Sequence, residues 1–189
     1  MGSVHSFEDR AVARLRARLG AAEEANQDLI AFARGHHGAV AAIHRAVLLA
    51  MQSTNLPELL QLVTAEWPQL LGIDNSALAV ARPQTAIVAT ADAIAPLDPA
   101  ILRRNLRGLA PVTLRDVERG HPLFGAACAE IRAEALIHIE SPRGQPIGLL
   151  LLGQGRSPGL DESGGSELLR FLGQSLGAMV GRWQDQAAG

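Results

Sequence analysis

The sequence predicts an α+β fold, in which an antiparallel sheet with packed helices follows a long N-terminal coiled-coil helix. Three observations support this prediction. A heptad pattern of apolar and small residues extends from Val12 to Ala50. Short β-prone segments then alternate with helical ones, and runs of strands between terminal helices are typical of α+β domains. The segment over residues 147–152 is almost wholly apolar, which predicts a strand covered on both faces in the centre of a sheet.

The first expected element is a helix from Phe7 to about Ser53. Its seam positions recur in steps of three and four residues, which is the spacing of a coiled coil. Asn26 occupies an a position, where Asn favours two-stranded pairing in register. We therefore expect a homodimer. The residues expected at its interface are Val12, Leu15, Leu19, Asn26 and Leu29.

Gly35 and Gly38 lie within this expected helix, and each glycine costs about 1 kcal/mol relative to alanine in a helix interior. Two arrangements remain open: one continuous rod, or a helix that breaks near these glycines so that its second half, from Val40 to Met51, packs on the domain. The predicted organisation is a dimerisation segment over residues 1–53 and one domain over residues 54–189.

The domain begins with a predicted helix. Asn55 precedes Leu56-Pro57-Glu58, a pattern of helix starts, and Gly72 is a natural stop, with Pro68 expected to bend or end the last turn. The segments over residues 76–82 and 85–91 predict a β-hairpin.

A short helix is expected to begin at Asp98-Pro99 and to end near Gly108. Residues 111–117 predict an edge strand, and His121-Pro122 leads into another short helix. Alternation from Ala135 to Glu140 predicts a strand with one wetter face. A turn over residues 142–146, the apolar strand and a helix over residues 161–183 complete the prediction.

Composition restricts the function classes. Of 189 residues, 48% are hydrophobic and only 3% aromatic, so a largely aliphatic core is expected. The net charge of −2 and pI near 6.3 argue against nucleic-acid binding through bulk electrostatics. The single cysteine, Cys128, excludes an internal disulfide and fits a reducing cytosol. The longest apolar run is too short to span a bilayer, so we expect a cytoplasmic protein.

Several stretches resemble the bacterial family called domain of unknown function number 484, which is related to GAF domains. They are Phe7 to Arg10 with Leu15, Arg16, Leu19, Asn26, Leu29, Ala33 and Arg34; Leu123-Phe124-Gly125; and Gly148 to Gly153 with Leu169, Phe171, Leu172 and Trp183. The resemblance covers nearly the whole chain. It implies a GAF-like fold, a cytosolic protein and no established activity, with no catalytic motif to transfer. The run from Gln154 to Pro158 departs from the Ser-Arg-Asp-like run expected there.

The residues themselves indicate no catalytic set, so an enzyme is not expected. Gly153-Gln154-Gly155 lacks the third glycine of a dinucleotide fingerprint, because Pro158 stands there. The histidines lack metal-ligand spacing, so we expect no metal site. Cys128 could be a nucleophile, a redox sensor or a chromophore attachment point, but a small buried core residue is the preferred interpretation. Arg103 and Arg107 could hold an anion or form a solvated helix face, and the second interpretation is preferred.

In GAF-like folds the ligand cavity lies between the sheet and the short helices that cross it. By analogy, the predicted ligand-binding residues are Leu102, Leu106, Phe124, Cys128 and His138, with Arg103 as a charged anchor. The leading hypothesis is a dimeric sensory or regulatory module that binds an unidentified small molecule and signals to a partner protein. The alternative is a ligand-free scaffold that acts through dimerisation and helix docking. The sequence names neither ligand nor cofactor.

Overall fold

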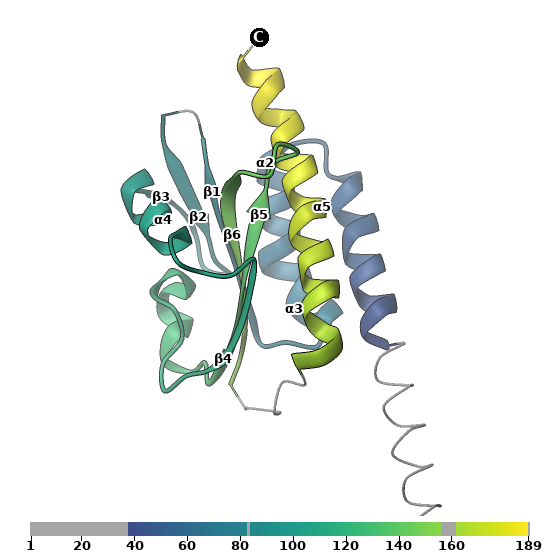
Figure 1. The fold of residues 1–189 in the computed structure, drawn as a ribbon, viewed down its shortest axis with the longest axis vertical. Coiled ribbons are helices and arrows are strands. Elements are labelled where there is room, and N and C mark those ends of the chain that lie inside the picture. The colour runs from purple at the N-terminus through teal and green to yellow at the C-terminus, as the bar shows by residue number, and fades with distance from the viewer. Residues whose placement is uncertain (1–37, 83, 156–161, 189) are drawn as a thin grey trace, which may run out of the picture. The chain divides into compact units, whose positions relative to one another are not determined.

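The computed structural model describes residues 38–82, 84–155 and 162–188 (Figure 1). The chain divides into two units, Met1–Ala39 and Val40–Gly189, and the fold below is that of the second. The expected dimer contacts from Val12 to Leu29 therefore lie outside the described residues.

A six-stranded antiparallel sheet in the order β3-β2-β1-β6-β5-β4 forms the centre of the domain. Its strands are β1 (Asn75–Ala81), β2 (Ala86–Ala89), β3 (Ile94–Leu97), β4 (Val112–Asp116), β5 (Ala133–Glu140) and β6 (Pro146–Gln154). The helical elements are a helix over residues 38–52, α2 (Leu56–Gln61), η1 (Leu62–Glu66), α3 (Trp67–Leu71), α4 (Pro99–Leu106), η2 (Pro122–Ala129) and α5 (Glu162–Ala188). The α+β fold class is confirmed, as are the central position of β6 and the edge position of β4.

Helices cover the two faces of the sheet differently. The 38–52 helix, α2, α3 and α5 lie on one face, and α4 and η2 lie on the other (Figure 1). Alternate side chains of the four inner strands, β2, β1, β6 and β5, enter two separate apolar clusters. Ile137 and Leu150 belong to the cluster beneath α5, whereas Leu136 and Leu151 belong to the cluster beneath α4 and η2.

The 38–52 helix packs on its own domain. Ile43, Val47 and Ala50, three of the residues on the expected dimer seam, are buried in the cluster beneath α5 together with Ala46. In this stretch the heptad positions therefore belong to the domain's own core and not to a dimer seam. Packing of residues 40–51 on the domain corresponds to the second arrangement considered, although the predicted domain boundary lay at residue 53.

Local chemistry explains the ends of the next helices. The side chain of Asn55 accepts a hydrogen bond from the Glu58 amide at 3.0 Å, and Gly72 ends α3 in the left-handed region at φ 68°. Pro68 has no amide hydrogen to donate, and η1, which immediately precedes α3, is π-helical. The helical segment from Leu56 thus changes from α-helical to π-helical hydrogen bonding before Pro68, and it continues as an α-helix to Leu71.

One feature of the sheet differs from the prediction and one agrees with it. Strand β3 was not expected, because Pro96 interrupts a short β-prone run; at the edge of a sheet proline is tolerated. The predicted wetter face of β5 is confirmed toward the end of the strand, where His138 and Glu140 are half-buried, whereas Glu134 and Leu136 on the same face are buried. Among the described residues, no helix is both long enough and apolar enough to cross a membrane.

Two glycines allow α5 to approach β5 closely. A Cβ atom at Gly173 would overlap the carbonyl oxygen of His138, and one at Gly177 would overlap that of Glu140. In contrast, a Cβ atom at Gly165, in the same helix, would meet nothing within 4 Å. The spacing of four residues places both close contacts on one side of α5.

We predict opposite effects of alanine at these positions. Gly177→Ala should lower the free energy of unfolding by about 1–3 kcal/mol, because α5 must move away from β5. Gly165→Ala should raise it by up to about 1 kcal/mol, because alanine favours the helix. Urea denaturation measures both, and equal effects of the two substitutions would contradict the close contact.

Candidate functional site

The candidate site lies on the sheet face covered by α4 and η2. Residues Glu134, Leu136 and His138 of β5 alternate onto this face. Leu102 from α4 and Leu123, Phe124 and Cys128 from η2 pack with Leu136, Leu149 and Leu151 from the sheet in one cluster. This cluster supports the two short helices that the sequence analysis placed around a ligand.

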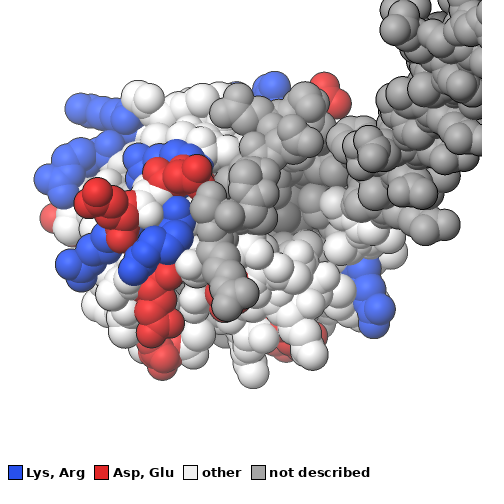
Figure 2. Space-filling model, turned by 90° about the horizontal axis from the view of Figure 1, so that it is seen from below, with Lys and Arg blue, Asp and Glu red and all other residues white. Residues whose placement is uncertain are grey.

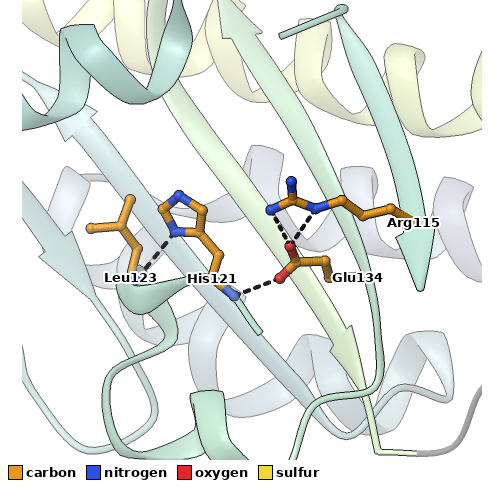
Figure 3. A network of polar contacts seen from close by, with 4 residues as sticks. All are labelled: Arg115, His121, Leu123 and Glu134. Atoms are coloured by element: carbon orange, nitrogen blue, oxygen red, sulfur yellow. Dashed lines mark hydrogen bonds and ion pairs between the residues drawn. The ribbon is translucent and has the colours of Figure 1, made fainter. Parts of the chain in front are cut away.

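A buried carboxylate anchors η2 to the sheet. Glu134 is only 1% exposed, and both of its oxygens are bound (Figure 3). Oε1 accepts a hydrogen bond from Arg115 Nε at 2.7 Å and lies 2.5 Å from Nη2. Oε2 accepts a hydrogen bond from the backbone N–H of His121 at 2.6 Å. One side chain therefore joins β5, β4 and the residue that precedes η2.

Further hydrogen bonds within residues 120–128 hold the segment around η2 in place. His121 Nδ1 accepts from the Leu123 amide at 3.2 Å, and the Gly120 amide donates to the Cys128 carbonyl at 2.8 Å. Gly125, at φ 64°, interrupts η2 in a backbone conformation that favours glycine. The segment thus forms a fixed, irregular cap over the sheet.

Burial lowers the pKa of His121, and this effect exceeds the opposing attraction of the Glu134 carboxylate. A neutral imidazole agrees with the geometry, because Nδ1 needs a free lone pair to accept from the Leu123 amide. Burial also lowers the pKa of His138, against the attraction of Glu140. In the part of the chain that the structure describes, the buried Nε2 of His138 has no hydrogen-bond partner.

A cavity of about 230 Å³ opens beside η2. Its lining combines Phe124 and small alanines with polar groups from the start of β1, the β2–β3 turn and the end of η2. The residues that line it are Asn75, Ser76, Thr90, Ala91, Asp92, Phe124, Ala126, Ala127 and Glu130. An apolar wall with a few polar groups is the usual construction of a small-molecule site.

The surface near η2 carries charges of both signs. Arg115, Asp116, Glu118, Arg119 and Arg132 are exposed in the segments that flank η2. Figure 2 likewise shows acidic and basic side chains interspersed on the side of the molecule seen there. Interspersed charges create no strong single-sign potential, so this surface does not favour a large polyanion.

The structure separates the predicted ligand-binding residues. Phe124 lines the cavity, whereas Leu102 and Cys128 are buried in the packed cluster and Leu106 packs at its margin. Arg103 is exposed on α4. His138 lies half-buried on the same sheet face. A ligand bound among Leu102, Leu106 and Cys128 would have to displace core side chains.

Cys128 is buried, as expected of a small core residue. Its Sγ accepts a hydrogen bond from Arg119 Nε at 3.4 Å. Because Gly125 interrupts η2, His121 and Cys128 do not share the face of one continuous helix. Arg103 and Arg107 both lie on the exposed surface at the end of α4. Among the described residues, no group of three His, Cys, Asp or Glu side chains could hold a metal ion.

The residue that sequence reasoning missed is Glu134. The sequence gives only one signal for it. Glu134 stands between Ala133 and Ala135, so in a strand it shares a face with Leu136 and not with the two alanines. Its partner Arg115 is 19 residues earlier in the chain. The two meet because Arg115 and Glu134 are directly paired in the β4–β5 register.

The model of a family described as "Protein of unknown function, DUF484" matches residues 1–185. No curated protein matches the chain.

Solved GAF-type structures show the same fold. The GAF domain of a phosphoenolpyruvate-protein phosphotransferase from Coxiella burnetii has a TM-score of 0.58 at 14% identity, over 82% of this chain and 99% of that one. The nlh2 GAF domain from A. Aeolicus, in an inactive state, has a TM-score of 0.53 at 13% identity, over 74% and 93%. The free methionine-R-sulfoxide reductase from Neisseria meningitidis, in complex with its substrate, has a TM-score of 0.53 at 15% identity, over 77% and 89%.

We predict that Glu134→Gln destabilises the domain by about 1–3 kcal/mol, because the amide cannot replace a charged acceptor shared by Arg115 and the His121 amide. Glu118→Gln, an exposed change in the neighbouring segment, should stay within about 0.5 kcal/mol of the wild type. Chemical denaturation measures both. A Glu134→Gln variant as stable as Glu118→Gln would show that the carboxylate does not anchor η2.

Stability should also depend on pH. A lowered folded pKa means that the unfolded chain binds the proton first, so stability is greatest above the ordinary histidine value of 6.5. It should fall as the pH decreases from there toward the folded pKa values of His121 and His138. Denaturation midpoints measured from pH 7.5 to 5 test this expectation. The change of the midpoint with pH should be smaller in the His121→Asn, His138→Gln double variant than in the wild type. The same pH dependence in the double variant and the wild type would show that His121 and His138 do not cause it.

Proposed function

Since this chain belongs to the DUF484 family and has the fold of GAF domains, we propose that it is a dimeric sensory or regulatory module, which binds a small molecule and signals to a partner protein. It acts by binding rather than by catalysis. The buried thiol of Cys128 fits the cytoplasmic setting that we propose for it.

The observation that carries the proposal is the cavity beside η2. At about 230 Å³ it is smaller than the pockets that hold drug-sized ligands, so it suits a small metabolite. Asn75, Thr90 and the carboxylates of Asp92 and Glu130 favour a polar ligand that donates hydrogen bonds, and Phe124 supplies an apolar contact.

A route for the signal leads from this cavity through the sheet. Glu134 attaches the start of η2 to β5, so a shift of η2 bears on that strand. On the other face of β5, α5 rests on the strand through Gly173 and Gly177, where there is no free space. The ring of Phe171 on α5 then contacts His44 of the 38–52 helix, with centroids 6.1 Å apart. We propose that ligand binding moves this helix pair.

A ligand-free scaffold is the second candidate. Two observations favour it: the packed cluster occupies the space predicted for a ligand, and Leu48, Met51 and Phe171 are exposed, as a docking surface requires.

Native mass spectrometry of the protein purified from its own host distinguishes the two candidates. We expect a dimer with an added mass that denaturation releases. Ala126→Leu narrows the cavity and should abolish the added mass, whereas Ala100→Leu, an exposed change on α4, should retain it. A dimer without added mass would favour the scaffold. A ligand retained equally by both variants would place the binding site elsewhere.

A further inference from the structure

We propose that the small molecule bound beside η2 is an organic cation, whose ammonium or guanidinium group is held by Asp92 and Glu130. The inference rests on the proposed function and names the chemical class of its ligand. Asp92 lies in the β2–β3 turn, and Glu130 follows the last residue of η2. Both line the cavity of about 230 Å³, and none of the described residues that line it is basic.

The side chains of the lining offer a ligand mainly hydrogen-bond acceptors. The Ser76 hydroxyl donates its hydrogen to the Val63 carbonyl at 2.5 Å, and the Thr90 hydroxyl donates to the Ala93 carbonyl at 3.3 Å. Each hydroxyl oxygen therefore has only lone pairs left for a ligand. The two carboxylates can only accept, and Asn75 is the one described lining side chain with amide hydrogens. A ligand that fits this lining must bring several donors of its own.

The arginines around η2 have other partners. Arg115 pairs with the buried Glu134, and Arg119 donates to a cysteine sulfur. The guanidinium of Arg132, which follows η2 in the chain, donates to two backbone carbonyls at 2.8 and 2.9 Å. Within the described residues, no ion pair joins an arginine to either cavity carboxylate. The negative charge of the lining is therefore left for a ligand to balance, and an anionic ligand would be repelled.

The lining favours an organic cation over a metal ion. In the described part of the chain, the carboxylates do not belong to any group of three side chains that could hold a metal. Phe124 and the alanines at 126 and 127 form an apolar wall instead, which suits the carbon skeleton of an amine or a guanidine. Since Phe124 is only 2% exposed, it presents a small part of its ring, and the matching skeleton is short.

A cation in this position would act on η2. Asp92 and Glu130 come from two different elements, so a cation bound by both draws the end of η2 toward the β2–β3 turn. The two elements are already close beside the cavity, because a Cβ atom at Gly125 would lie 3.6 Å from the Thr90 methyl group. The start of η2 is attached to β5 through Glu134. Binding would thus pull on the same segment that the proposed signal route begins from.

Ion-exchange chromatography of the compound that the protein releases tests its charge. The full chain is purified from its own host and denatured, and the small-molecule fraction is applied to a cation exchanger at neutral pH. We expect the compound that accounts for the added mass to be retained and to elute with salt. A neutral or anionic compound would overturn this inference and leave the proposed function standing. If denaturation released no compound, the proposed function and this inference would fail together.

Removal of the two charges provides the second measurement. After dialysis of the protein, the released compound should bind at least about tenfold more weakly to the Asp92→Asn, Glu130→Gln double variant than to the wild type in isothermal titration calorimetry. Glu118→Gln, an exposed change outside the lining, should bind it as the wild type does. Because Asp92 and Glu130 are exposed, the double variant should keep the wild-type denaturation midpoint. Equal affinity of the double variant and the wild type would overturn the proposal.

Discussion

The hydrogen bonds of one buried carboxylate, that of Glu134, join β4, β5 and the start of η2. An ionised side chain that is removed from water loses several kcal/mol of solvation unless charged or polar partners replace the solvent. Glu134 has such partners for both oxygens, in Arg115 on β4 and in the His121 amide before η2. Arg115 keeps 45% of its side chain exposed, so only one charge of the pair is fully buried. The edge strand, the strand beside β6 and the irregular cap over the sheet are thereby fixed together.

The helices pack more tightly on one face of the sheet than on the other. Beneath α5 the contact is tight, because glycines at 173 and 177 bring the helix backbone against the carbonyl groups of β5. Beneath η2, Gly125 interrupts the helical turns and small residues at 126 and 127 leave a cavity at the end of the sheet. This arrangement suits the sensor that we propose. Because α5 packs tightly against β5, a displacement of η2 that reaches β5 is passed on to α5 and is not absorbed by loose packing.

Sequence patterns predicted the features that depend on neighbouring residues. Asn55 and Gly72 marked helix ends, and the apolar run over residues 147–152 marked the central strand. The features that depend on register could not be predicted in this way. Glu134 meets Arg115 through strand pairing, and apolar spacing does not reveal whether Leu102 and Cys128 line a space or fill it. The heptad pattern marked apolar positions at 43, 47 and 50 correctly, but not that the domain itself would cover them.

Hydrogen–deuterium exchange of the protein purified from its own host, compared with the same protein after denaturation and refolding, tests the central claim most directly. We expect the native preparation to exchange more slowly at η2 and at the β2–β3 turn, where a ligand would lie, and also along the 38–52 helix, where its effect would be transmitted. Identical exchange in the two preparations, or a difference confined to segments away from η2, would contradict the proposal that a ligand at this cavity controls the helix pair.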